Sequence, residues 1–346
     1  MERMRLNLDT KAANVGETPL TVSRIGLGTW AIGGWMWGGT DDQESVDTIR
    51  AAVERGINLI DTAPAYGFGH SEEIVGRAIA ESQLRSRVVI ATKVGLEWKN
   101  GKVFRNASRD RILLEAEDSL RRLRTDYIDL YQVHWPDPLV SIEETAEAVQ
   151  ALFDQGKIRA IGVSNFSVAQ IERFRRVAKL HVVQPPYNLF ERAIETELLP
   201  YCRQHGIATL TYGALCRGLL SGKLQADARF HGDDLRLTDP KFQSPRYAEY
   251  LAAVRRLDQF AMDHYGKRVI HLAVRWLLDQ GVTTALWGAR RPDQLHAVDE
   301  VFGWSLDVAA KVEIDRILRE TIADPVGPEF MAPAPRPEVA VLQAAQ

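Results

Sequence analysis

The chain alternates between short apolar runs and longer stretches in which apolar residues recur at helical intervals. In the stretch 43–56, for example, Val46, Ile49 and Val53 lie on one helical face, and Gly56 follows as a stop signal. The pattern predicts a strand at each apolar run, with helices between the strands. The eight runs are residues 23–30, 57–63, 88–94, 127–134, 158–165, 182–188, 207–215 and 283–289.

This alternation predicts a parallel sheet, because each parallel connection needs a crossover that a helix usually supplies. Eight strand–helix units favour closure as an α/β fold of the (β/α)8 TIM-barrel type, whose active site lies at the C-terminal face of the strands. A doubly wound open sheet is the alternative. It would usually carry G-x-G-x-x-G after its first strand, and the chain has no such motif.

Two segments depart from the regular alternation. Residues 221–247 form a long polar connection after the seventh predicted strand, and connections of that length are usually functional or disordered. From residue 324 the chain is rich in proline and alanine, and we expect its last dozen residues to be mobile. The sequence therefore predicts one barrel domain over residues 1–323 and a partly mobile tail over 324–346.

Polar residues stand at the ends of three consecutive predicted strands. They are Asp61, Lys93 and His134, and Tyr66 follows Asp61 in the next loop. Strand ends of a barrel meet at one rim, so we expect these four side chains to converge. Asp61 or His134 alone would more often be a structural residue, but the four types together indicate a catalytic site.

This set suggests proton transfer by the tyrosine. A free tyrosine has a pKa of about 10, so working near neutral pH needs a fall of roughly 3 units, or ~4 kcal/mol. A lysine ammonium about 4 Å away supplies on the order of 4 kcal/mol at an effective dielectric of 20. We therefore expect Lys93 to lower the pKa of Tyr66, Asp61 to keep Lys93 protonated, and His134 to hold or orient the substrate oxygen. Tyr66 would be the general acid or base of a carbonyl–alcohol reaction, and a nicotinamide cofactor would carry the hydride.

Composition and charge exclude several other classes of protein. The 346 residues carry 43 basic and 46 acidic side chains, and no basic stretch indicates nucleic-acid binding. Cys202 and Cys216 are the only cysteines, which favours a reducing, cytoplasmic location. No run approaches the ~18 apolar residues of a membrane span, and the N-terminus lacks an apolar signal region. The eight histidines are too scattered for a metal site, so we expect no metal.

The chain resembles the aldo-keto reductases from about residue 19 to about residue 323. The motifs that carry the resemblance are LIDTAPAYG, VIATKV, TDYIDLYQVHWPDP, IRAIGVSNF and GALCRGLLSGK. Within that family the likeness is greatest to bacterial glycerol and glyceraldehyde dehydrogenases, through GTWAIGGWMWGGTDD and the tail motif GPEFMAP. Asp61, Tyr66, Lys93 and His134 occupy the family's catalytic positions.

The resemblance implies that NADPH or NADP+ is the cofactor. Arg290 is the candidate for the 2′-phosphate, because its planar fork suits phosphate oxygens. Ser164, Asn165 and Gln184 would bind the nicotinamide carboxamide, and Tyr212 would stack on the ring. The full set of implied cofactor residues is Thr29, Trp30, Ser164, Asn165, Gln184, Tyr212, Gly213, Ala214, Leu215, Arg217, Gly218, Lys223, Gly288, Arg290 and Gln294.

Several of these residues also have structural interpretations. Ser164 and Asn165 could cap the helix that follows, although Ser167 is the better cap. Gln184 could serve only the kinked backbone before two prolines, and Arg290 could begin a solvated helix. Four tryptophans, Trp30, Trp35, Trp37 and Trp135, could be core residues or a substrate wall. Such a wall would suit the C–H faces of a polyol or sugar and equally an aromatic aldehyde.

The expected function is NADP(H)-dependent interconversion of small aldehydes or ketones with alcohols. A metal-dependent hydrolase is disfavoured by the scattered histidines. A nucleotide-binding regulatory subunit is the other alternative, because ion-channel β subunits share the aldo-keto reductase pattern. Those subunits carry long N-terminal extensions, whereas this chain reaches its first predicted strand within about twenty-five residues. We expect a small-molecule substrate and neither a nucleic acid nor a membrane as partner.

Overall fold

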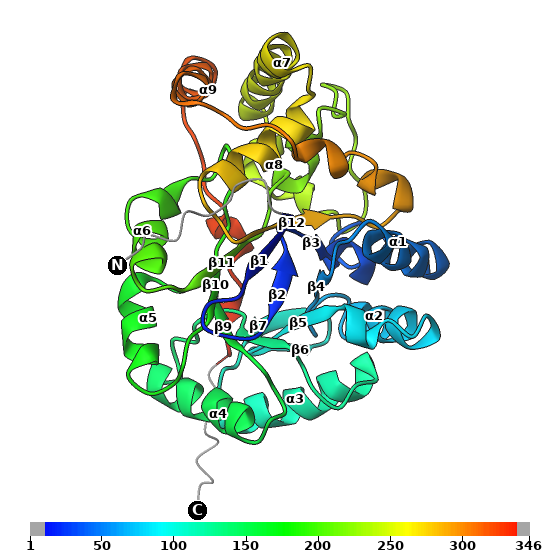
Figure 1. Ribbon diagram of the computed structural model, residues 1–346, viewed down its shortest axis with the longest axis vertical. Coiled ribbons are helices and arrows are strands. Elements are labelled where there is room, and N and C mark those ends of the chain that lie inside the picture. Colours follow the sequence, from blue (N-terminus) through cyan, green and yellow to red (C-terminus); the bar gives the residue numbers. More distant parts are fainter. Residues whose placement is uncertain (1–10, 338–346) are drawn as a thin grey trace, which may run out of the picture.

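Eight parallel strands close into a barrel at the centre of the molecule (Figure 1). The computed structural model describes residues 11–337. Strand β9 pairs with β10 and so closes the ring, which confirms the predicted (β/α)8 fold. The barrel strands are β3 (Ile25–Gly28), β4 (Leu59–Asp61), β5 (Val89–Val94), β8 (Leu130–Val133), β9 (Ile161–Ser164), β10 (Val182–Gln184), β11 (Ala208–Thr211) and β12 (Thr284–Gly288).

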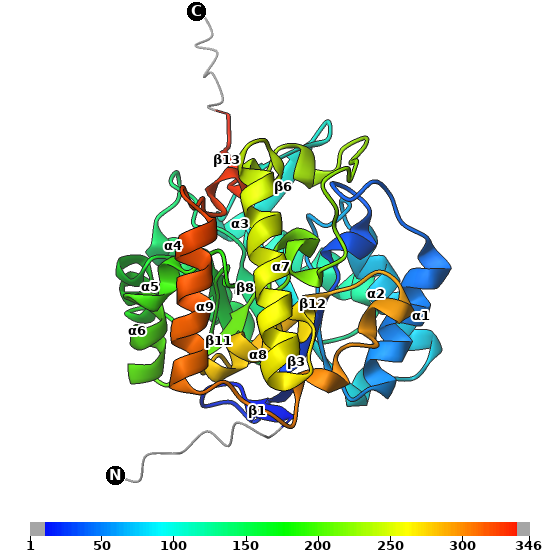
Figure 2. The ribbon, with the colours of Figure 1, turned by 90° about the horizontal axis from the view of Figure 1, so that it is seen from above.

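Helices surround this barrel, and two of them form an outer pair. Helices α7 and α9 contact each other outside the ring, and Figure 2 shows them side by side. In the position after β12, a short 3-10 turn at Pro292–Leu295 packs against α1. The helices are α1 (Asp42–Glu54), α2 (His70–Glu81), α3 (Arg109–Leu123), α4 (Ile142–Asp154), α5 (Val168–Arg175), α6 (Leu198–Gln204), α7 (Arg246–Tyr265), α8 (Val269–Asp279) and α9 (Val308–Thr321).

Helix α1 has the origin that the sequence pattern predicts. The Asp41 side chain accepts a hydrogen bond from the backbone N–H of Glu44, which caps the first turn. Val46 and Ile49 are buried, and Gly56, with φ of 84°, ends the segment in the left-handed region. Local capping and an apolar face therefore fix this helix against the barrel.

The structure contains two hairpins that the sequence did not predict. An antiparallel pair, β1 (Ala12–Asn14) and β2 (Thr21–Ser23), covers the N-terminal end of the barrel, opposite the tail in Figure 2. Its Val22 is buried in one cluster with Leu59 and Leu130 of the barrel strands. The second hairpin, β6 (Leu96–Lys99) and β7 (Lys102–Arg105), follows β5 at the C-terminal end.

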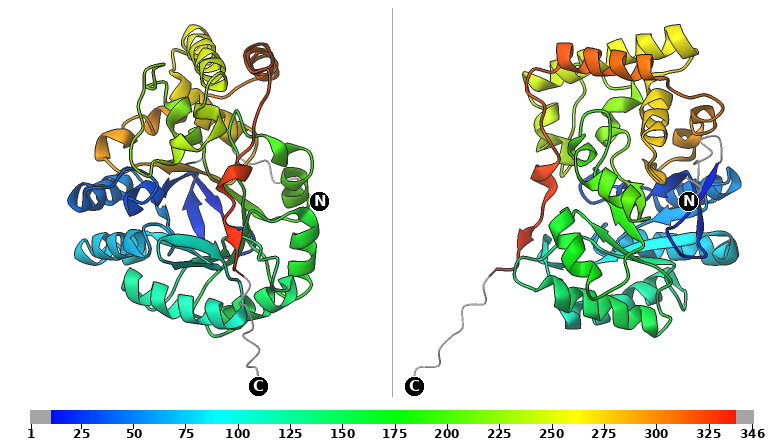
Figure 3. Two further views of the ribbon diagram at one scale, coloured as in Figure 1. Left: turned by 180° about the vertical axis from the view of Figure 1, so that it is seen from behind. Right: turned by 60° about the vertical axis from the view of Figure 1, so that its left-hand side comes forward.

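The tail lies across the C-terminal mouth of the barrel (Figure 3). Its strand β13 (Ala334–Pro335) pairs in parallel with β7. Arg105 of β7 holds the tail next to this strand, because its Nε donates to the carbonyl oxygen of Pro333 at 2.8 Å. Of the last dozen residues, where we expect mobility, Pro335 pairs with Arg105 of β7, and residues 338–346 lie outside the described range. One domain over 1–323 with a tail over 324–346 remains our proposed division.

Gly76 provides a test of how tightly α2 packs. A Cβ at this position would lie 2.3 Å from the carbonyl oxygen of Arg122 at the end of α3. We expect Gly76→Ala to lower the free energy of unfolding by about 3 kcal/mol, because overpacking outweighs the gain in helix propensity of ~1 kcal/mol. Urea denaturation measures the change.

Gly156→Ala is the control for that substitution. Its Cβ would meet nothing within 4 Å, but its φ is 74°. We expect a loss of about 1 kcal/mol from backbone strain alone. Equal losses at the two sites would contradict the packing argument.

Candidate active site

The four residues predicted to converge do meet at the C-terminal end of the barrel. Lys93 Nζ donates to Asp61 Oδ1 at 2.6 Å and to the carbonyl oxygen of Thr62 at 2.9 Å. The same nitrogen lies 4.9 Å from the centroid of the Tyr66 ring. The ring of His134 stands edge-on to that of Tyr66, with centroids 5.8 Å apart. Parallel strands β4, β5 and β8 are neighbours in the barrel, and their ends therefore bring these side chains together.

Two glutamines complete the surroundings of Asp61. Gln184 Nε2 donates to Asp61 Oδ2 at 2.8 Å, and Gln132 Nε2 donates to the same oxygen at 3.3 Å. Gln132 enters this space because its neighbour is Gly162, where a Cβ would lie 2.8 Å from Gln132 Cγ. Sequence reasoning missed Gln132. The available signal was a polar residue in the middle of an otherwise apolar strand.

Burial shifts the pKa values of Tyr66, Lys93 and His134. Burial raises the pKa of Tyr66 well above its usual value, and the nearby Asp61 carboxylate raises it further. Burial and the positive charge of Lys93 hold the pKa of His134 well below its ordinary range. Burial lowers the pKa of Lys93, and Asp61 opposes that fall. At neutral pH the site therefore holds a protonated tyrosine and a neutral imidazole.

One electrostatic expectation was wrong. The sequence led us to expect Lys93 to lower the pKa of Tyr66, but that pKa is raised. The main reason is burial of the tyrosine, which disfavours its charged form. The ammonium of Lys93 is also paired with Asp61 at 2.6 Å, and the carboxylate of Asp61 raises the pKa of Tyr66 further. Neither the Tyr66 hydroxyl nor the His134 imidazole has a hydrogen-bond partner within residues 11–337.

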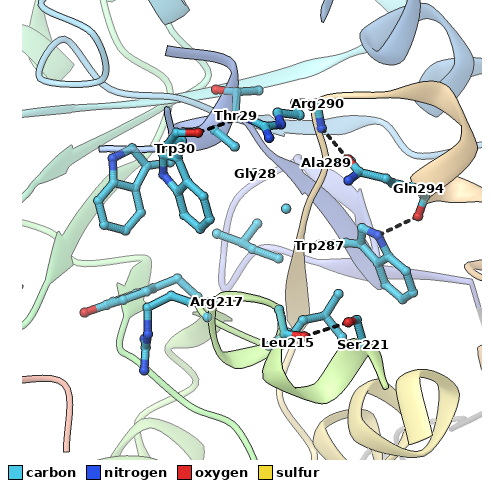
Figure 4. Close-up of a pocket in the computed structure, with 18 of the residues that line it drawn as sticks. Gly28, Thr29, Trp30, Leu215, Arg217, Ser221, Trp287, Ala289, Arg290 and Gln294 are labelled. Carbon is cyan, nitrogen blue, oxygen red and sulfur yellow. Dashed lines mark hydrogen bonds between the residues drawn. The ribbon is translucent and has the colours of Figure 1, made fainter. Parts of the chain in front are cut away.

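Two cavities meet at Tyr66. The first has a volume of about 310 Å³ and runs between the ends of β3, β11 and β12 (Figure 4). The second, of about 410 Å³, opens toward the β6–β7 hairpin and the tail. Trp30, Tyr66, Tyr212 and Met331 line both. A ligand in either cavity would therefore reach the tyrosine.

The residues predicted from the sequence fall into two sets, according to which cavity they line. Asp61 lines the first cavity, His134 the second, and Lys93 contacts Asp61 without lining either. Trp135 lines the second and Trp37 only the first, so substrate contact by Trp37 stays a prediction. The first cavity holds Thr29, Trp30, Tyr212, Gly213, Ala214, Leu215, Arg217, Gly218, Lys223, Gly288, Arg290 and Gln294, and the second holds Ser164, Asn165, Gln184, Trp30 and Tyr212.

The first cavity offers hydrogen-bond donors suited to an anion. The backbone N–H groups of Gly213, Ala214 and Leu215 have no partner in the described part of the chain. Lys223 lines the same cavity, and its ammonium forms no ion pair or hydrogen bond with the described residues. The buried Nε1 of Trp37 lacks an acceptor there as well. Successive free amides beside a cation form a concavity that binds phosphate groups.

Arg290 lies at the far end of the same cavity. Its Nη1 donates to the carbonyl oxygens of Trp37 and Gly39, each at 2.9 Å. Its backbone N–H donates to Gln294 Oε1, as Figure 4 shows. Its Nε and Nη2 have no partner among the described residues, so a planar donor edge remains for a ligand. Arg291, by contrast, pairs with Asp293 and lines neither cavity.

The residues at the inner end of the second cavity are joined to one another by hydrogen bonds. Ser164 Oγ donates to the carbonyl oxygen of Gln184 at 2.7 Å, and Tyr212 OH donates to Asn165 Oδ1 at 2.8 Å. Asn165 Nδ2 donates to the carbonyl oxygen of His134 at 3.0 Å. Ser167 caps α5 with a full capping box, as predicted. Ser164 and Asn165 therefore do not cap that helix.

Other lining residues come from the glycine-rich loop, the tail and the 221–247 connection, and of these Trp35 was named from the sequence as a core residue or part of a substrate wall. Met331 and Pro333 of the tail, and Trp35 and Met36, line the second cavity. Arg236 brings the 221–247 connection to the first. That connection also crosses to the glycine-rich loop, where Asp233 accepts hydrogen bonds from the backbone N–H groups of residues 36 and 38. Long-range folding places these residues at the cavities, although the motifs GTWAIGGWMWGGTDD and GPEFMAP contain the four that line the second.

Two absences apply to the described residues alone. Residues 11–337 contain no group of three or more histidine, cysteine, aspartate or glutamate side chains that could hold a metal ion. In the same range, no helix combines the length and the apolar character that a membrane span requires.

Comparison with known proteins identifies the family. The model described as "Aldo/keto reductase family" matches residues 24–319, which include the whole barrel and both cavities apart from the tail residues. The chain belongs to the aldo/keto reductase family. The recognition made from the motifs is thereby confirmed, and the chain is a member of an oxidoreductase family.

Relatives of this aldo/keto reductase extend over almost its full length. An aldo-keto reductase of Bacillus subtilis, YhdN, is 62% identical over 94% of this chain and 99% of its own. An NADH-specific methylglyoxal reductase of Escherichia coli is 37% identical over 82% and 91%. A probable voltage-gated potassium channel subunit beta of Arabidopsis thaliana is 32% identical over 91% and 98%.

Solved structures agree with this assignment. A glycerol dehydrogenase from Gluconobacter oxydans has 54% identity and a TM-score of 0.84, over 93% of this chain and 99% of its own. An aldo/keto reductase from Klebsiella pneumoniae, in complex with NADP and acetate, has 29% identity and a TM-score of 0.68, over 89% and 95%.

Proposed function

We propose that this aldo/keto reductase transfers a hydride between NADP(H) and the carbonyl of a small aldehyde or ketone, with Tyr66 as general acid or base. The observation that carries the proposal is the position of Tyr66, which lines both cavities and lies beside the Lys93–Asp61 pair and His134. A residue in that position can reach a carbonyl in one cavity while the hydride donor occupies the other.

The protonation states support carbonyl reduction directly. Burial and Asp61 keep the pKa of Tyr66 high, so at neutral pH its hydroxyl carries the proton that a reduced carbonyl oxygen needs. The low pKa of His134 leaves a neutral imidazole, which can donate one hydrogen bond to the same oxygen without bringing a charge. In the oxidation direction Tyr66 must lose its proton first, which the same environment opposes.

The first cavity fits a nicotinamide dinucleotide. When bound, the nicotinamide supplies or accepts the hydride, which no side chain can do. The free amides of Gly213, Ala214 and Leu215, with Lys223, would hold the pyrophosphate. Ser164, Asn165 and Gln184 line the second cavity, so they would bind the carboxamide where the nicotinamide end passes from the first cavity into the second. Tyr212, which lines both cavities, would stack on the ring.

NADPH is the proposed preference over NADH. The supporting observation is Arg290, whose Nε and Nη2 are unpaired among the described residues at the far end of the cavity. A guanidinium matches the oxygens of a 2′-phosphate. The relatives differ in this respect, because the Klebsiella enzyme was solved with NADP and the Escherichia coli reductase is NADH-specific.

The second cavity supports a small carbonyl substrate with C–H faces. Its inner end is polar, at Tyr66, His134 and Asn165, whereas Trp135 and other aromatic and aliphatic side chains form its outer wall. We propose substrates of the glyceraldehyde, polyol or sugar type, a choice supported by the similarity to a glycerol dehydrogenase. Comparing kcat/KM for glyceraldehyde and benzaldehyde tests this choice, and a large preference for benzaldehyde would overturn it.

A nucleotide-binding regulatory subunit is the second candidate, because a probable channel subunit is 32% identical over most of both chains. Such a subunit would bind NADPH without sustained turnover.

We propose the cytoplasm as the location, since both Cys202 and Cys216 are free and buried.

Tyr66→Phe tests the proton donor. We expect kcat/KM for carbonyl reduction to fall about 1,000-fold, because the phenyl ring cannot donate a proton. Cofactor absorbance during turnover measures the rate, and unchanged NADPH binding is the control. A variant that keeps more than about a tenth of native activity would remove Tyr66 from this role. A native protein that binds NADPH but never turns over on a broad carbonyl panel would favour the regulatory subunit.

The pH dependence should differ between the two directions. Because the pKa of Tyr66 is raised, its hydroxyl stays protonated at neutral pH, and kcat for reduction should be flat from about pH 6 to about pH 8. Oxidation needs the ionised fraction, so its rate should rise about tenfold per pH unit over the same range. Equal pH slopes in the two directions would contradict this assignment.

Arg290→Gln tests cofactor preference. We expect the KM for NADPH to rise about 10- to 100-fold, because one charge-assisted contact to phosphate is lost, and the KM for NADH to change much less. Arg291→Gln is the matched control, since this arginine is adjacent and lines neither cavity. An unchanged NADPH-to-NADH ratio in Arg290→Gln would refute the role.

A further inference from the structure

Four charged side chains form a buried ion cluster beneath the anion-binding loop. Arg217 donates through Nη2 to Glu191 Oε1 and through Nε to Asp239 Oδ2. Lys241 Nζ lies 2.8 Å from Glu191 Oε1. Lys241 and Asp239 are fully buried, and Arg217 and Glu191 are nearly so. With two positive and two negative members, the cluster is neutral as a whole.

The cluster is attached to the amides that line the first cavity. Cys216 and Arg217 have φ values of 44° and 53°, in the left-handed region that residues with side chains adopt at a cost of about 1–2 kcal/mol each. Glu191 also accepts a hydrogen bond from Asn188 Nδ2, which donates to the carbonyl oxygen of Gly213 as well. The turn that presents the amides of residues 213–215 is therefore held at both ends.

The same cluster is attached to the tail. Lys241 Nζ donates to the carbonyl oxygen of Gly327 at 3.0 Å, and the Arg217 guanidinium lies 5.6 Å from the centroid of the Phe330 ring. Phe330 lines neither cavity, but the next residue, Met331, lines both. One set of charges thus contacts the loop of residues 213–218 (the cofactor loop), the 221–247 connection and the tail.

Stability alone does not explain this arrangement. Taking ions out of water costs as much as their attraction returns, so a buried cluster adds little net stability over apolar side chains of similar volume. What such a cluster does supply is fixed geometry, because each charge must keep its partners. Here the geometry that is fixed is a strained turn beside an anion site.

We infer that Glu191, Asp239 and Lys241 are positioning residues, which hold Arg217 and the adjoining turn so that the cofactor loop and the tail keep one arrangement. The inference rests on the proposed function of the first cavity as the cofactor site. Asp239 and Lys241 line neither cavity, and Glu191 does not either, so their effect on a ligand passes through Arg217, Asn188 and the tail.

Charge-neutralising substitutions separate positioning from simple electrostatics. Lys241→Met leaves the cluster with a net negative charge, and Glu191→Gln leaves it with a net positive charge. If the cluster acted by charge alone, Glu191→Gln would strengthen NADPH binding and Lys241→Met would weaken it. If it positions the loop, both substitutions weaken binding, by about 10-fold in Kd measured from the fluorescence of bound NADPH.

Glu195→Gln is the matched control. Glu195 is half-buried, pairs with Arg192, accepts a hydrogen bond from the Tyr187 hydroxyl and lines neither cavity. Because glutamine can still accept from that hydroxyl, we expect the replacement to leave the Kd for NADPH unchanged. A native-like Kd in both Glu191→Gln and Lys241→Met, or opposite shifts in the two, would overturn the inference while leaving the proposed function intact. A native protein that binds no dinucleotide would instead overturn the proposed function.

Phe330→Ala tests the link to the tail without burying an unpaired charge. We expect the Kd for NADPH to rise several-fold in this variant, although the side chain lines neither cavity. This substitution is the deciding experiment if the two cluster variants fail to fold. An unchanged Kd for NADPH in Phe330→Ala would overturn the inference that the cluster holds the tail and the loop in one arrangement.

Discussion

The ion pair between Lys93 and Asp61 is the interaction on which the site depends. Lys93 is fully buried, and an ammonium in that position needs a carboxylate and further acceptors to stay charged. Asp61 supplies the carboxylate, and Thr62 supplies a carbonyl oxygen. Because these residues end adjacent parallel strands, barrel closure brings them within contact distance and fixes the electrostatic environment of Tyr66 and His134.

Burial together with this pairing explains the protonation state of Tyr66. A lone ammonium would favour an ionised tyrosine, but a paired one leaves burial as the main effect on Tyr66. Gln132 and Gln184 strengthen the arrangement by donating to the second oxygen of Asp61. The buried polar groups form one connected network across four strands, and a change at any member leaves another without its partner.

Local sequence patterns predicted the parts of the fold that local physics determines. All eight barrel strands and the helix over 43–56 follow from apolar periodicity, and the strand-end residues follow from barrel geometry. The hairpins were missed because each is short and pairs only with itself or with the distant tail. The raised pKa of Tyr66 was missed because it depends first on burial of the tyrosine in the folded barrel and then on the Asp61 carboxylate, and the depth of burial is not encoded by spacing along the chain.

The described tail is held mainly through its main chain. Its attachments include the carbonyl oxygens of Gly327 and Pro333, the N–H of Val326, which donates to the Tyr250 hydroxyl, and the β13–β7 pairing. Main-chain attachments tolerate exchange of side chains, whereas Met331 faces the place where a ligand would bind. Point substitutions at Met331 would therefore change the chemistry that this rim offers to a ligand while the tail stays attached, and the barrel beneath it would need no compensating change.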